Sequence, residues 1–188
     1  MTDSKPADTH GEGRPARRSE HRQRLLVSIP IVSTTDTNGS EERIVEALVR
    51  REHAVSRLYR LYAERFGGYR AFWLELAGEG VSHAKWLLRL YERTRDGSGC
   101  IDRGRLAAEP IERSAVHVEG LCEQAAAGAV PLPDALAVAV RLERETLECG
   151  YAEVFNSRVP EILQVQYCLT YSARKHLERA EALVAEVG

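Results

Sequence analysis

Aromatic residues are scarce in this chain of 188 residues, where phenylalanine, tryptophan and tyrosine together make up only 6%. Hydrophobic residues as a whole make up 44%, so any core must be built mainly from aliphatic side chains. A chain of this length fits one domain of ordinary size plus a tail.

The chain also lacks a large excess of charge of either sign. Its formal net charge is -2 and its sequence pI is about 6.3. A protein that binds nucleic acid over its surface is usually strongly basic. We therefore do not predict nucleic-acid binding by the molecule as a whole.

No apolar run reaches the roughly 18 residues that a membrane-spanning helix needs. The first residues, Met1 to Lys5, show no apolar segment of the kind found in secretory signals. The four cysteines are widely spaced and form no CxxC pair, whereas zinc and rubredoxin-like iron sites need close pairs. We expect a soluble cytoplasmic protein with free thiols and no contact with a membrane.

Residues 1–24 are polar and carry five arginines within a short stretch. An apolar segment follows at 25–32, and residues 34–40 contain Asn38-Gly39, a pair typical of turns. The sequence therefore predicts a disordered tail and linker over 1–40 and a folded domain over 41–188.

Within that domain, apolar residues recur at steps of three and four along several segments, and no strand pattern interrupts them. We predict main helices over about 41–66, 69–93, 134–155 and 160–187, with a weaker crossover helix over about 109–127. Two helices, a long crossover and two more helices favour an all-α, antiparallel four-helix bundle with one long crossover connection.

Ionisable residues interrupt the middle of each predicted apolar stripe. The first stripe contains Glu52, the second contains Glu79 and His83 one turn apart, the third contains Glu143 and the fourth contains His176. If the helices pack antiparallel, these five side chains meet at one level of the interior.

Such a meeting requires charge compensation, because a buried carboxylate without a partner costs several kcal/mol or becomes protonated. Each residue alone has a simple structural explanation, since a glutamate can reach solvent from the edge of a stripe and a histidine can be satisfied in a core. Five together favour a metal site, because a metal ion would balance the carboxylates and use both imidazoles.

The run Phe72–Ala84, FWLELAGEGVSHA, together with Glu52-x-x-Val55-x-x-x-Tyr59 resembles the rubrerythrin branch of the ferritin-like superfamily. Proteins of that branch bind two irons between four helices and perform oxidation, peroxide reduction or iron storage. The resemblance implies that Glu52 and Glu143 are terminal carboxylate ligands, and that His83 and His176 are imidazole ligands, of iron or manganese.

The chain departs from the family pattern at two positions. The family places a bridging glutamate three residues before each histidine, and these positions hold Gly80 and Ala173. Glu79 can face the core and substitute for the first of them. The cysteine-paired rubredoxin domain is also absent, so a redox-active protein would need an external electron donor.

Three functional interpretations remain open at this point. The first is a metal-dependent oxidoreductase or metal-binding protein, with Glu52, Glu79, His83, Glu143 and His176 as ligands. The second is a metal-free helical scaffold or interaction module that has lost this chemistry. In the third, the arginine-rich tail touches nucleic acid or anionic lipid. A homodimer is compatible with the first two.

Overall fold

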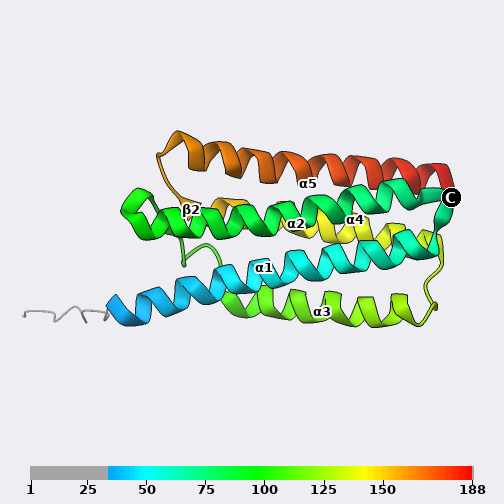
Figure 1. Ribbon diagram of the computed structural model, residues 1–188, viewed down its shortest axis with the longest axis horizontal. Coiled ribbons are helices and arrows are strands. Elements are labelled where there is room, and N and C mark those ends of the chain that lie inside the picture. Colours follow the sequence, from blue (N-terminus) through cyan, green and yellow to red (C-terminus); the bar gives the residue numbers. More distant parts are fainter. Residues whose placement is uncertain (1–33, 188) are drawn as a thin grey trace, which may run out of the picture. The chain divides into compact units, whose positions relative to one another are not determined.

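The computed structural model describes residues 34–187, so the predicted tail over 1–24 and the apolar segment over 25–32 lie outside the described residues. The described part is almost entirely helical, which confirms the all-α prediction (Figure 1). Its α-helices are α1 (Thr34–Arg65), α2 (Arg70–Arg93), α3 (Ala108–Ala126), α4 (Leu132–Cys149) and α5 (Pro160–Val187). None of these helices combines the length and the apolar character that a membrane span requires.

Short elements join the helices. A 3-10 turn, η1 (Gly67–Tyr69), links α1 to α2, and a π-helical turn, η2 (Thr94–Ser98), follows α2. Two strands that the sequence did not predict, β1 (Cys100–Ile101) and β2 (Phe155–Asn156), pair antiparallel with Ile101 opposite Phe155. A further 3-10 turn, η3 (Tyr151–Val154), precedes β2.

Helix boundaries differ from the prediction at two places. α1 already begins at Thr34, and the Asn38-Gly39 pair lies inside it rather than in a linker. Extending a formed helix costs much less than starting one, so an unfavourable pair can be absorbed at its end. α4 ends at Cys149 rather than near 155, because Gly150 adopts a left-handed conformation with φ 61° and stops the helix.

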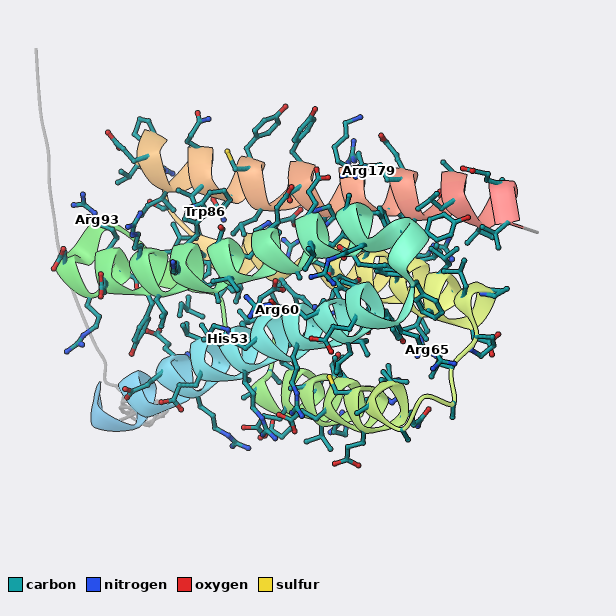
Figure 2. The ribbon with its side chains drawn as sticks, turned by 45° about the vertical axis from the view of Figure 1, so that its right-hand side comes forward. His53, Arg60, Arg65, Trp86, Arg93 and Arg179 are labelled. Atoms are coloured by element: carbon teal, nitrogen blue, oxygen red, sulfur yellow. The ribbon has the colours of Figure 1, made fainter. Side chains whose placement is uncertain are left out.

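Side-chain contacts give the direction of each helix relative to its neighbours. α1 runs antiparallel to α2, with Ser56 donating a hydrogen bond of 2.7 Å to the carbonyl of Ala77. α2 is likewise antiparallel to α5, and α5 is antiparallel to α4. On the surface, Arg179 of α5 reaches Glu75 of α2 at 2.7 Å (Figure 2).

The predicted crossover helix is present as α3, which lies along α1 and runs parallel to it (Figure 1). Arg43 pairs with Glu112 at 2.7 Å and Arg50 pairs with Glu119 at 2.7 Å, both between these two helices. α3 thus carries the chain from the end of α2 back to the start of α4, so that α4 enters antiparallel to α1.

The buried apolar residues form two separate clusters. The first apolar cluster gathers around Tyr59, Tyr62 and Trp73, whose rings lie within 5.7 Å of one another in successive pairs. The second apolar cluster contains Leu48 and Phe155. Along α1, α2 and α5, the ionisable residues that the sequence singled out lie between the two clusters.

Candidate functional site

The five residues predicted to converge do come together between the two apolar clusters. We call them the polar layer: Glu52 of α1, Glu79 and His83 of α2, Glu143 of α4 and His176 of α5. Their side chains are linked by close contacts between carboxylate oxygens and imidazole nitrogens. The convergence follows from the antiparallel packing, which brings the middles of the helices to one level.

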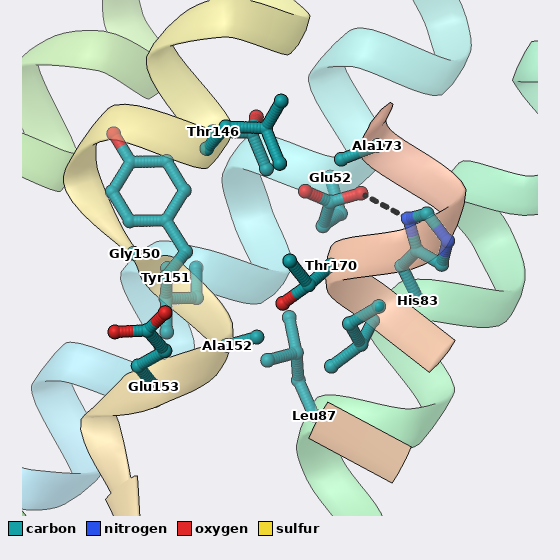
Figure 3. A pocket seen from close by; sticks show the side chains of 13 residues that line it. Glu52, His83, Leu87, Thr146, Gly150, Tyr151, Ala152, Glu153, Thr170 and Ala173 are labelled. Atoms are coloured by element: carbon teal, nitrogen blue, oxygen red, sulfur yellow. Dashed lines mark ion pairs between the residues drawn. The ribbon is translucent and has the colours of Figure 1, made fainter. Parts of the chain in front are cut away.

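The first contact within the polar layer joins α1 to α2. Nδ1 of His83 lies 3.4 Å from Oε2 of Glu52, and Figure 3 marks this ion pair. The His83 side chain is 10% exposed and that of Glu52 is 13% exposed, so both groups are largely removed from water. Trp86 flanks His83, with 5.8 Å between ring centroids.

The second contact set surrounds His176. Its Nδ1 lies 3.5 Å from Oε1 of Glu143, and its Nε2 lies 3.0 Å from Oε2 of Glu79. The contact of Nε2 with Glu79 is at ion-pair distance, although it is not counted as a hydrogen bond. His176 therefore stands between two carboxylates, one beside each ring nitrogen.

The two contact sets adjoin. The rings of His83 and His176 stack with 6.1 Å between centroids. Ser172 of α5 connects them further, since its hydroxyl lies 3.0 Å from Nε2 of His83 and also donates to Glu79. Sequence reasoning missed Ser172, although it stands one turn before His176 on the same helix.

Glu79 differs from the other members of the polar layer. Its side chain is 42% exposed, whereas those of His176 and Glu143 are 4% and 8% exposed. The expectation that all five lie in the interior is therefore wrong for Glu79. It stands at the edge of the layer because it precedes His83 by four residues rather than three, which rotates it toward solvent.

The charges of the polar layer support one another. Burial acts to raise the pKa of Glu52, but His83, with smaller contributions from Arg51 and His176, outweighs it and holds the pKa of Glu52 below its usual range. Burial acts to lower the pKa of His176, but Glu143 and Glu79 outweigh it and raise that pKa. In the metal-free layer Glu52 is therefore ionised, which contradicts the idea that its protonation balances the charge.

A buried tyrosine completes the layer on the side of the first apolar cluster. The hydroxyl of Tyr59 donates a 2.9 Å hydrogen bond to Oε1 of Glu143. Burial, with the charge of Glu143, raises the pKa of Tyr59 well above its usual value, so the hydroxyl keeps its proton. Tyr59 thus fixes the same oxygen of Glu143 that lies 3.5 Å from Nδ1 of His176.

The structure also places a buried arginine against the layer. Arg51 is 1% exposed, and its Nη1 lies 3.6 Å from Oε1 of Glu52. Sequence reasoning missed Arg51 because it followed only the stripe through Glu52. A second stripe, Ile44-Ala47-Arg51-Ala54-Leu58, was available in the sequence and is buried throughout.

Two small cavities adjoin the layer. One, of about 20 Å³, is lined by members of the polar layer together with Gly80 and Ala173. The other, of about 30 Å³, opens from Glu52 and His83 toward Thr146, Gly150 and Thr170 (Figure 3). A space of 10 to 15 Å³ or more holds roughly one water molecule, so the first cavity has room for a single small ion or water.

Over residues 34–187, no three histidine, cysteine, aspartate or glutamate side chains are already arranged to hold a metal ion. The reason is visible in the contacts, because the carboxylates and imidazoles face one another in pairs. Gly80 and Ala173 line the cavity without offering a donor. Imidazoles and carboxylates are donors that first-row metal ions accept, but Gly80 and Ala173 provide no carboxylate that could bridge a second ion.

Comparisons of this chain with protein-family models, with curated proteins and with solved structures find no match.

Proposed function

We propose that this chain is a ferritin-like four-helix bundle, related to rubrerythrins, that binds one iron or manganese ion in its polar layer. α1, α2, α4 and α5 form the bundle in this interpretation, and α3 is its long crossover connection. The antiparallel order of neighbouring helices supports it, as does the position of the layer between two apolar clusters.

The observation that carries the proposal is the meeting of two imidazoles with the carboxylates of Glu52, Glu79 and Glu143 within 3.5 Å at one level of the helices. A metal ion would take Nε2 of His176 as a nitrogen donor and would balance the negative charge of the carboxylates. His83, Glu52 and Glu143 would supply the remaining donors, with Glu79 at the solvent edge. One ion is favoured over two because both bridging positions lack a carboxylate.

A bound iron or manganese ion would supply redox chemistry toward dioxygen or peroxide. The chain's own part would be to hold the ion, to exclude bulk water with the two apolar clusters, and to leave a narrow approach beside Thr146 and Thr170. Electrons would have to come from an external donor. The activity would accordingly be that of an oxidoreductase.

Metal analysis of the full-length protein tests this proposal. Protein produced in medium supplemented with iron and manganese and purified without chelator should retain about one metal ion per chain. Mass spectrometric elemental analysis gives the ratio. A ratio near zero, together with equal melting temperatures in metal-containing and chelator-containing buffer, would contradict it.

The second candidate function is the metal-free scaffold, which the buried Arg51 and the positions Gly80 and Ala173 favour. In that case the polar layer is held together by its internal ion pairs alone. The same experiment separates the two candidates, because only the metal-binding protein changes its stability when the metal is removed.

A further inference from the structure

Arg51 is the most completely buried charged residue among those that the structure describes, with 1% of its surface exposed. A buried guanidinium needs both charge partners and hydrogen-bond partners, because removing it from water is costly. Each of its nitrogens faces a polar atom, and those atoms belong to three different helices.

The contacts of Arg51 hold it in one orientation. Nε donates to the hydroxyl of Ser114 at 3.1 Å, and Nη2 donates to the carbonyl of Leu142 at 3.2 Å. The guanidinium carbon also lies 4.8 Å from the ring centroid of Tyr151. Ser114 and Tyr151 in turn both donate to one oxygen of Glu145, at 2.8 and 3.1 Å.

Two carboxylates flank the guanidinium. Glu52 lies 3.6 Å from Nη1 and Glu145 lies 3.8 Å from Nη2. The two oxygens of Glu52 therefore have different partners, because Oε1 faces Arg51 while Oε2 faces His83. Only Oε2 is left to serve as a donor inside the polar layer.

We propose that Arg51 takes the place of a second metal ion in this centre. It pairs with one oxygen of Glu52 and adds a fixed positive charge to the polar layer. The layer is thereby limited to one divalent ion, which it binds with moderate affinity. This inference rests on the proposed function. It also explains why Gly80 and Ala173 stand where the family has carboxylates. Carboxylates at these positions would bind a second metal ion, and Arg51 already supplies the positive charge that such an ion would bring.

Titration of the chelator-treated, full-length protein with Mn²⁺ and Co²⁺ tests the role of Arg51. Arg51→Met removes the charge and keeps much of the volume, and it should bind Mn²⁺ at least about tenfold more tightly than the parent, because the repulsion between two nearby cations is lost. Arg51→Lys keeps the charge and should stay within about threefold of the parent.

Arg144→Met is the matched control, because Arg144 pairs with Glu181 on the exposed surface between α4 and α5. Its affinity for Mn²⁺ should equal that of the parent. A residue with a merely structural role would lower the melting temperature in both Arg51 variants without this difference in affinity. Equal or weaker binding by a folded Arg51→Met protein would overturn the inference.

If Arg51→Met does not fold, Glu145→Gln decides the question without changing Arg51. It removes one negative charge from the far side of the guanidinium and should weaken Mn²⁺ binding by about tenfold, whereas Glu181→Gln should not. Unchanged binding by Glu145→Gln would overturn the inference.

The titration also separates this inference from the proposed function. If the parent binds no metal ion but Arg51→Met does, the proposed function fails and the role of Arg51 as the excluding cation stands. If the parent binds metal and Arg51→Met binds it no more tightly, the proposed function stands and the inference fails. If neither binds, both fail.

Discussion

At the scale of single residues, the polar layer holds charged side chains in an apolar interior. Glu52 and His176 are buried among apolar helices, yet their pKa shifts both favour the charged form. Each carboxylate has an imidazole within 3.5 Å, so the layer is electrostatically paired before any ligand arrives. A metal ion would therefore have to displace internal ion pairs, and its net affinity would be lower than the number of donors suggests.

His83→Ala is expected to lower the metal content, because it removes a nitrogen donor and leaves the carboxylates in place. The parent should melt at a higher temperature with Mn²⁺ than with chelator, corresponding to about 2.7 kcal/mol at a free concentration a hundredfold above the dissociation constant. The variant should lose most of this difference. Calorimetry in both buffers measures it.

His53→Ala serves as the control for His83→Ala, since His53 is an exposed residue of α1. It should keep the full difference between the two buffers. A His83→Ala protein that still gains the parent's stabilisation from Mn²⁺ would show that His83 is not a ligand.

The raised pKa of His176 predicts the pH dependence of the metal-free protein. The protonated imidazole is stabilised by Glu143 and Glu79 in the folded state. Its contribution to stability is fully present below the unfolded-state pKa, near 6.5, and is lost as the pH rises through the higher folded-state pKa.

In chelator, the parent should therefore lose more stability between about pH 6 and about pH 9 than His176→Gln does, because the variant has no proton to lose there. Urea unfolding at each pH gives the comparison. Parallel pH profiles for the two proteins would mean that the imidazolium does not contribute.

Residue-level prediction from the sequence succeeded where a polar residue interrupted a clean apolar stripe, as at Glu52, His83 and His176. It failed for Arg51, because α1 is covered on two sides and therefore has two buried stripes. The exposure of Glu79 was also missed, since a spacing of four residues was treated as equivalent to a spacing of three. Neither the contact of Ser172 with two layer residues nor the pairing of β1 with β2 follows from periodicity, because both depend on partners far away in the sequence.

At the scale of the elements, glycine is required by the backbone conformation after α4 but not within α2. Gly150 adopts φ 61° and ends α4, whereas Gly78 lies on the exposed face of α2 with no atom near the place of a Cβ. The end of α4 matters for the site, because Gly150 and Tyr151 line the cavity that opens from Glu52.

Gly150→Ala should destabilise the protein by about 1 kcal/mol, because alanine resists the left-handed conformation. Gly78→Ala should instead stabilise it by up to about 1 kcal/mol, since alanine favours the helix interior. Urea unfolding of both variants measures the two effects. Equal effects of one sign would show that the backbone at 150 is not constrained as described.

At the scale of the whole described domain, α3 is more than a connection. It buries Ile111, Ala115, Val118 and Cys122 against its neighbours, and Ser114 contributes to the surroundings of Arg51. A helix that merely crossed the outside of a bundle would leave the four others stable without it. Here the polar layer depends on α3 through Arg51.

Ile111→Ala is expected to cost about 2 to 4 kcal/mol, because it removes a fully buried side chain. Unfolding should remain a single cooperative transition, as expected if α3 and the other helices fold together. Val116→Ala, at a position of α3 that is 55% exposed, should change stability by less than about 0.5 kcal/mol. Two separate transitions for Ile111→Ala would show that α3 folds independently.

The pairing of β1 with β2 has a consequence for the axial register of the helices. β1 follows α2 and β2 precedes α5, and their backbones approach so closely that a Cβ at Gly99 would lie 2.8 Å from the carbonyl oxygen of Asn156. The strand pair thus fixes the position of the start of α5 along the axis of α2. A slip of one helical turn would move His176 by about 5.4 Å, which exceeds its 3.0 Å separation from Glu79. Two pairs of strand residues at one end of the domain therefore set the alignment of charges at its middle.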